Sequence, residues 1–237
     1  ERKKHEKKVT EFRKIKIIKE LQKKYKKLKV YDHHKSHAAS AYFFSNFKEC
    51  YSLTIDGWGD NASSKLFYCK GGKIEECRRT STIDSLGYFY GSITKLLGFT
   101  PHKHEGKVLG LAAFSNPKIA YREISKLICF NRKTKNFEGS TEKGIYLPRF
   151  DNDRLNYLLK KFSKSEIAAA TQKRLEDVVL DYIKSISKKK IDLALAGGVF
   201  SNVKLNQKIS ELSSIKNIYV FPNMGDGGLA VGAAALC

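Results

Sequence analysis

Residues 51–79, YSLTIDGWGDNASSKLFYCKGGKIEECRR, contain three short runs that are rich in β-forming residues. The pair Gly71-Gly72 stands between the last two runs, which is typical of a tight hairpin. The stretch therefore predicts three consecutive antiparallel strands. These strands are expected at 51–56, 65–70 and 73–79.

Downstream of this block, helical periodicity alternates with short apolar strands. We predict helices at 86–97, 106–114, 166–187, 203–212 and from 229 onward, and strands at 191–195 and 218–221. The irregular stretch 115–165 is interpreted as an insertion or lid, with a helical run at 119–128. Three antiparallel strands followed by alternating helices and strands are the pattern of a ribonuclease-H-like lobe. The predicted fold class is therefore α/β, actin/hexokinase-like, with a mixed sheet flanked by helices.

Upstream of the strands, the spacing of apolar residues predicts an amphipathic helix over 11–28 and a short strand at 28–31. Asp32 is placed to cap a helix over 34–44. In an actin-like protein two lobes bind a nucleotide between them. We therefore assign 1–50 to the tail of a first lobe, with a metal-binding helix, and 51–237 to a second lobe.

The chain carries a formal net charge of +21, and residues 1–30 contribute +10 of it with 14 Lys and Arg against 4 Asp and Glu. A nucleic-acid surface and a solvated amphipathic helix both fit such a segment. No zinc finger or RNA-recognition signature accompanies the charge, so nucleic acid is not expected as a partner.

The five cysteines show no C-x-x-C pair, and reduced thiols in a cytoplasmic protein are expected. No apolar run is long enough for a membrane span, so no membrane partner is expected. The chain begins with Glu1 rather than Met and has no apolar signal region. We interpret it as a fragment of a longer protein.

The segment DHHKSH, 32–37, holds three of the six histidines. His33 and His37 are four residues apart and would share one face of a helix, so both imidazoles can reach one metal ion. His34 and His37, at a spacing of three, would share a face as well. Both pairings remain open from the spacing alone.

Three Gly-containing turns follow predicted strands. Asp56 ends the first strand, where it suits a metal ion, and residues 57–64 suit a phosphate through backbone amides, although an ordinary hairpin turn fits them too. A strand, a Gly-Gly pair and a helix start occur at 195–202, which would let a backbone approach a nucleotide. The third turn, 221–228, contains Asp226.

Six segments taken in this order resemble the O-carbamoyltransferases, whose members act in nodulation-factor, cephalosporin and aminoglycoside biosynthesis. They are HHKSHAASAYFFSNF, LTIDGWGDNAS, SLGYFYGSITKLLGF, EGKVLGLA, LALAGGVFSNVKLN and VFPNMGDGGLAVGAA. The resemblance implies an N-terminal actin-like transferase domain related to the tRNA threonylcarbamoyl-transferase subunit. A further domain of the same protein, absent here, would make carbamoyl-adenylate from carbamoyl phosphate and ATP. The chain alone is expected to be inactive.

Carried over to this sequence, the resemblance assigns a role to each of several residues. The metal ligands would be His33, His37, Asp56 and Asp226. The adenylate pocket would hold Gly57, Asn61, Gly197, Gly198 and Asn202, with Gly225 and Gly227 from the third turn. His33 and His37 would also be catalytic. Lys107 is a third catalytic candidate on its own chemistry, because a lysine beside Gly106 can contact a phosphate or carbamoyl oxygen, although a surface lysine explains it equally.

The resemblance implies a transferase that moves a carbamoyl group from carbamoyl-adenylate to a hydroxyl of a small molecule. An iron-type ion is implied, and two imidazoles with two carboxylates suit Fe(II), Mn(II) or Zn(II). Two alternatives remain: a subunit that forms threonylcarbamoyladenosine in tRNA, and a non-catalytic nucleotide-binding module.

Overall fold

The computed structural model describes residues 15–140 and 153–237. Five strands form one mixed sheet in the order β3-β2-β1-β6-β7. Strands β1 (Glu49–Gly59), β2 (Ala62–Lys70) and β3 (Lys73–Ser81) are antiparallel, whereas β6 (Ile191–Ala196) and β7 (Ile215–Val220) run parallel to β1. This topology confirms the predicted ribonuclease-H-like arrangement, and five of the six predicted strands belong to the sheet.

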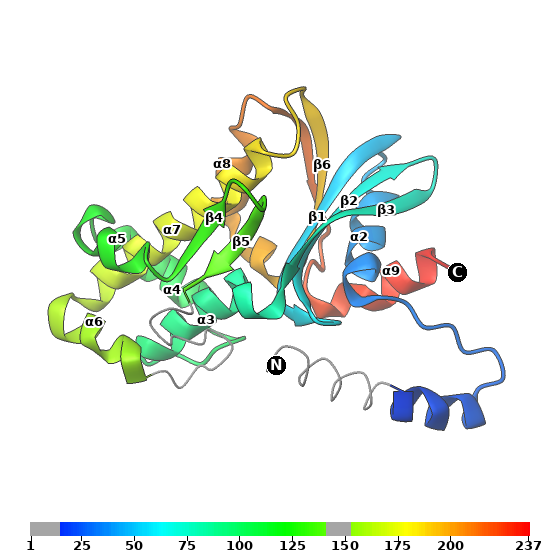
Figure 1. The fold of residues 1–237 in the computed structure, drawn as a ribbon, viewed down its shortest axis with the longest axis horizontal. Helices are drawn as coiled ribbons and strands as arrows, with labels where there is room; N and C mark the ends of the chain where they lie inside the picture. The colour runs from blue at the N-terminus through cyan, green and yellow to red at the C-terminus, as the bar shows by residue number, and fades with distance from the viewer. Residues whose placement is uncertain (1–14, 141–152) are drawn as a thin grey trace.

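Alternating side chains on the central strands give the sheet two unlike faces. Leu193 and Leu195 point to one face and belong to a large core formed with helices α3 (Leu86–Leu96), α7 (Lys164–Lys184) and α8 (Val203–Ser210). Ala194 and Ala196 point to the other face and pack with α2 (His33–Phe44). Figure 1 shows α2 and α9 (Leu229–Ala235) on one side of the sheet and α3 and α7 on the other. The small residues let α2 approach the sheet closely.

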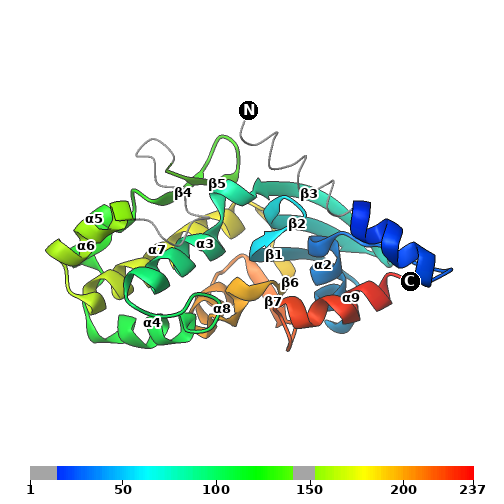
Figure 2. The ribbon, with the colours of Figure 1, turned by 90° about the horizontal axis from the view of Figure 1, so that it is seen from below.

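The described residues of the predicted insertion, 115–140 and 153–165, lie outside the five-stranded sheet. They contain α5 (Lys118–Ile124), a hairpin of β4 (Ile128–Asn131) and β5 (Asn136–Gly139), the 3-10 turn η3 (Asp153–Leu155) and α6 (Asn156–Lys161). The helix predicted to reach residue 128 ends earlier, because the chain turns there into the hairpin. Figure 2 shows α5 and α6 at the end of the molecule opposite α9. The remaining elements are α4 (Glu105–Leu111) and the 3-10 turns η1 (Thr82–Asp84), η2 (Ala112–Phe114), η4 (Gly198–Ser201) and η5 (Asp226–Gly228).

Two expectations for the N-terminal part need correction. The predicted strand at 28–31 is irregular. Side chains, and not backbone pairing, attach this segment to the end of the chain. Tyr31 Oη donates a hydrogen bond to the carbonyl of Leu236 at 3.0 Å, and Lys29 Nζ donates one to the carbonyl of Cys237 at 3.3 Å. The predicted helix over 11–28 is present over 15–24, and its residues 11–14 lie outside the described part. The division into two lobes at residue 50 stays a prediction.

Candidate metal centre

Helix α2 carries three histidines at its start. The helix begins at His33 because Asp32 caps it, with its Oδ1 atom accepting a hydrogen bond from the backbone N–H of Lys35 at 2.9 Å. His33 and His37 lie one turn apart and share a face, and their ring centroids are 4.8 Å apart. That face is directed at the end of strand β1.

Two carboxylates from distant segments meet these imidazoles. Asp56 lies toward the end of β1, and Asp226 opens η5 immediately before α9. His37 Nε2 is 3.2 Å from Asp56 Oδ2 and 3.6 Å from Asp226 Oδ1. His33 Nε2 is 3.6 Å and 3.7 Å from the same two oxygens. The structure therefore brings the four predicted metal ligands together, with one ligand atom of each within 4.8 Å of the others.

The cluster is buried at α2 and open at Asp226. The side chain of His37 is fully buried, whereas that of Asp226 is 73% exposed. Burial alone would raise the pKa of the Asp56 carboxyl, but the imidazoles of His33 and His37 outweigh it and hold that pKa far below its usual range. Burial alone would lower the pKa of His37, and the two carboxylates reverse this and raise it. Asp56 is thus ionised, which is the form that attracts a cation.

The donor atoms of the cluster fit a divalent metal ion. Ligand atoms bound to one such ion at about 2.1 Å stand roughly 3 to 3.5 Å apart, close to the 3.2–3.7 Å between these nitrogens and oxygens. Within the described ranges, His33 Nε2 is buried and has no hydrogen-bond partner. A buried nitrogen without a hydrogen bond lowers the stability of the folded protein unless a water molecule, an ion or a ligand binds to it. The residues present therefore fit the predicted ion.

His34 takes a different part, which decides between the two pairings left open by the spacing. Its Nδ1 atom is 2.8 Å from Thr54 Oγ1, and its Nε2 atom is 3.1 Å from the carbonyl oxygen of Ala62. Both ring nitrogens are engaged on the β1–β2 hairpin, and desolvation lowers the pKa of the ring to about 4. His34 is a neutral residue that attaches α2 to the sheet.

Two close backbone approaches bring the cluster together. A Cβ atom on Gly59 would lie 2.1 Å from His33 Cδ2, so the imidazole rests directly on the backbone of β1. A Cβ atom on Gly232 of α9 would lie 1.8 Å from the carbonyl oxygen of Ser36. Helices α2 and α9 therefore pack backbone against backbone, which places Asp226 beside His37.

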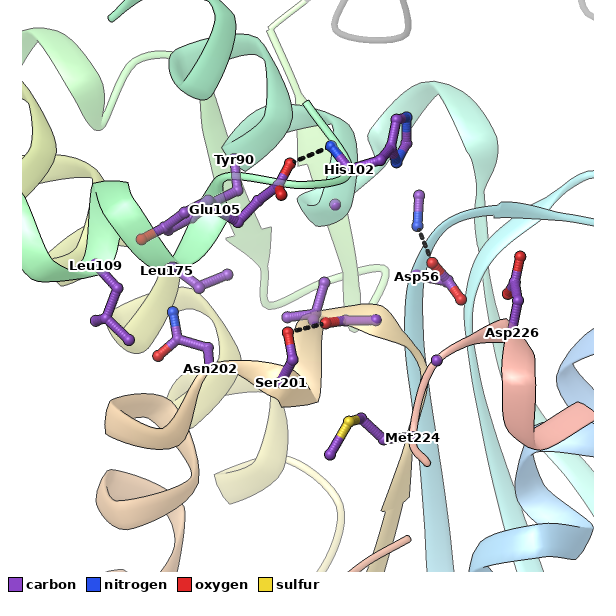
Figure 3. A pocket seen from close by; sticks show the side chains of 16 residues that line it. Asp56, Tyr90, His102, Glu105, Leu109, Leu175, Ser201, Asn202, Met224 and Asp226 are labelled. Carbon is purple, nitrogen blue, oxygen red and sulfur yellow. Dashed lines mark hydrogen bonds between the residues drawn. The ribbon is translucent and has the colours of Figure 1, made fainter. Parts of the chain in front are cut away.

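A cavity of about 430 Å³ opens next to the cluster, as Figure 3 shows. Asp56 and Asp226 lie in its wall, so it adjoins the cluster directly. Of the residues predicted for the adenylate pocket, Gly57, Gly198, Asn202 and Gly225 line it.

Other predicted residues lie outside this lining. Gly197 has φ +100° and sits against the carbonyl of Ile55, where a Cβ atom would come within 2.3 Å. Lys107 is exposed, and its Nζ atom lies 5.8 Å from the ring centroid of Phe99. Two further predicted residues do not line the cavity either: Asn61 lies in the β1–β2 turn and Gly227 lies in η5. Their binding or catalytic roles stay predictions.

Several cavity residues were missed by sequence reasoning. His102 and Glu105 stand at the cavity, joined by a hydrogen bond of 2.7 Å from the His102 backbone N–H to Glu105 Oε1 (Figure 3). His102 has φ +63°, a conformation rare outside glycine. A histidine in a Pro-containing loop ahead of a helix was a usable signal, because such loops often carry functional residues.

A buried polar network closes the far side of the cavity. Gln172 Nε2 donates to Glu176 Oε1 at 2.8 Å and to Asn202 Oδ1 at 3.2 Å. Gln172 Oε1 accepts from Asn202 Nδ2 at 2.8 Å and from Tyr90 Oη at 3.1 Å. Gln172 and Glu176 also line a second cavity of about 630 Å³, which shares Leu109 with the first. Polar residues that interrupt the apolar stripe of the 166–187 helix were the available signal.

The chain matches known sequences over nearly its whole length. The family model described as "Carbamoyltransferase N-terminus" matches residues 1–235. The uncharacterized protein MJ1058 of Methanocaldococcus jannaschii is 35% identical over 239 residues, which cover 93% of this chain and 39% of the relative. The nodulation protein NolNO of Sinorhizobium fredii is 32% identical over 215 residues, which cover 86% and 30%. The chain thus spans about two fifths or less of the length of these curated relatives.

The fold is similar to that of a solved structure of low sequence identity. Component A of (R)-2-hydroxyglutaryl-CoA dehydratase from Acidaminococcus fermentans superposes with a TM-score of 0.52 at 15% identity, covering 85% of this chain and 65% of that one. This likeness bears on the fold alone and confirms the predicted actin-like α/β class. In the described ranges, none of the helices combines the length and apolar character needed to cross a bilayer.

Proposed function

The chain belongs to the carbamoyltransferases, as the N-terminal part of that family, and from this premise we propose that it binds carbamoyl-adenylate and transfers the carbamoyl group to a hydroxyl of a small molecule. In that step the acceptor oxygen forms a bond to the carbamoyl carbon while the bond from that carbon to the phosphate oxygen breaks. The products are the carbamate ester, AMP and one proton. The convergence of two imidazoles and two carboxylates at the edge of a cavity carries the proposal.

The ligands of the ion would be His33, His37, Asp56 and Asp226. An ion such as Fe(II), Mn(II) or Zn(II) would supply Lewis acidity toward the carbamoyl and phosphate oxygens when bound. The chain's own part is to hold two nitrogens and two oxygens in place, with Asp56 ionised by its surroundings. The open side at Asp226 leaves room for a substrate oxygen.

The cavity beside the cluster would hold the adenylate. The backbones of Gly57, Gly198 and Gly225 line it without side chains, so a phosphate can approach their peptide groups. The nucleoside would extend toward Asn202 and the second cavity, where the polar groups of the Gln172 network face it. The carbamoyl carbon would then lie near the cluster, with the acceptor hydroxyl entering from the exposed side.

A single substitution tests the role of the cluster. In the full-length protein, supplied with carbamoyl phosphate, ATP and a panel of hydroxyl acceptors, His37→Ala should reduce carbamoyl transfer at least a hundredfold, because it removes the most buried ligand. Carbamoyl-adenylate should still form and accumulate. His104→Ala is the matched control, since His104 is outside both the cluster and the cavity lining. Transfer by His37→Ala at the unaltered rate would refute the proposal.

A further inference from the structure

Lys65 of strand β2 is a buried lysine with two acidic partners. Its side chain is 5% exposed, and its Nζ atom is 3.0 Å from Asp32 Oδ2 and 2.8 Å from Glu76 Oε2. Lysine is almost never this buried unless it is paired. Lys70, on the same strand, pairs with Glu49 at 2.7 Å but is 62% exposed.

Stability alone gives a weak reason for this arrangement. Burying the ammonium of Lys65 costs free energy that its attraction to two partly exposed carboxylates only partly returns, so an apolar side chain in the same space is often as stable. The neighbours Leu66 and Phe67 show that apolar residues pack well along β2. The charge at Lys65 therefore points to a role in positioning its partners.

The two carboxylate oxygens of Asp32 make different contacts. One oxygen, Oδ1, accepts from the backbone N–H of Lys35 and starts helix α2. The other, Oδ2, is held by Lys65. The backbone carbonyl of Asp32 also accepts from Ser36 Oγ at 3.0 Å. Lys65 therefore fixes the first turn of α2 to the sheet through the residue that initiates the helix.

His33 follows Asp32 directly and is held from the same hairpin. Its backbone N–H donates to Asp60 Oδ2 at 2.8 Å, and its ring rests on Gly59. If the start of α2 turned or slid, the imidazoles of His33 and His37 would both swing away from Asp56, because they lie on one face of the helix. The rotation of this first turn sets the geometry of the cluster.

We propose that Lys65 is a positioning residue for the metal centre, which acts by clamping Asp32 so that His33 and His37 face Asp56 and Asp226. This inference rests on the proposed function, since it concerns the same cluster. Groups that orient metal ligands typically change metal affinity by about 10–100-fold when they are altered.

The test is a titration of the protein with Co(II), followed by visible absorption. Lys65→Met keeps the aliphatic stem and removes the charge, and it should weaken Co(II) binding by about 10–100-fold and change the shape of the absorption band at saturation. Lys65→Arg should restore much of the affinity because it keeps a cation between the carboxylates. Lys70→Met, on the same strand with a like partner, should bind Co(II) as the unaltered protein does.

A second variant covers the case in which Lys65→Met does not fold. Asp32→Asn keeps a side-chain oxygen for the helix cap but loses the charge that Lys65 holds, so it should show the same loss and the same change of band shape. Unaltered Co(II) affinity and band shape in either folded variant would overturn the positioning role of Lys65. His37→Ala checks that the Co(II) ion binds at the cluster, and if this variant abolishes binding, the proposed metal centre stands without the role of Lys65. No Co(II) binding by the unaltered protein would overturn the positioning role and the metal proposal together.

Discussion

The two faces of the sheet hold their polar groups in different ways. On the α2 face, His33 and His37 are placed on a helix whose backbone touches α9, and His33 Nε2 is left without a hydrogen-bond partner among the described residues. On the α7 face, Gln172 and Asn202 satisfy one another in a closed network. On the first face a buried nitrogen is left without a hydrogen bond, which the metal ion of our proposal would satisfy. On the second face the buried amides are already satisfied by one another.

The largest expected effect concerns the helix contact behind the cluster. In Gly232→Ala the new Cβ atom would lie 1.8 Å from the carbonyl oxygen of Ser36, so α2 and α9 must separate. Overpacking of this kind should lower the free energy of unfolding by about 3 kcal/mol. Co(II) affinity should fall as well, because Asp226 lies in η5 directly before α9 and His37 lies on α2. Chemical denaturation and the Co(II) titration measure the two effects.

Gly110→Ala is the control for that prediction. Gly110 lies in α4, where a Cβ atom meets nothing within 4 Å, so the free energy of unfolding should rise by about 0.5–1 kcal/mol. If Gly232→Ala unfolds at the same denaturant concentration as the unaltered protein, this result would contradict the close backbone contact between α2 and α9.

A smaller effect is expected where β1 supports an imidazole. Gly59→Ala would place Cβ 2.1 Å from His33 Cδ2, and the ring should be pushed out of line with the two carboxylates. We expect Co(II) affinity to fall about tenfold, which corresponds to about 1.4 kcal/mol. Gly57→Ala on the same strand meets its nearest atom at 3.8 Å and should leave Co(II) affinity unchanged. Equal affinities in the two variants would contradict the preformed position of His33.

The smallest effect should come from the opposite face. Gln172→Leu removes the amide that joins Tyr90, Glu176 and Asn202, so the free energy of unfolding should fall by about 1 kcal/mol. AMP binding, measured by calorimetry, should weaken while Co(II) affinity stays the same. Gln207→Leu is the control for stability, because Gln207 is exposed. A loss of Co(II) affinity in Gln172→Leu would show that the two faces are coupled.

Much of the fold could be predicted from the sequence, because the sequence features that indicate its helices and turns lie within a few residues of one another. The Gly71-Gly72 turn, the Asp32 cap and the apolar stripe of the 166–187 helix each depend on residues close together in the chain. The prediction of a strand at 28–31 was wrong because strand formation depends on residues far away in the chain. A strand needs an edge with which to pair, and this segment instead meets the end of α9 through side chains. The β4–β5 hairpin was missed within charged, irregular sequence.

By itself the sequence determined the order of the five sheet strands and their main helices, and the residue types able to bind a metal ion, since periodicity, caps and turns act over a few residues. The family resemblance had named His33, His37, Asp56 and Asp226, but only the tertiary structure shows that these four side chains converge while His34 turns to the sheet. The spacing allowed either pairing. The choice depends on the rotation of α2, which contacts with β1, β2 and α9 set between residues far apart in the chain.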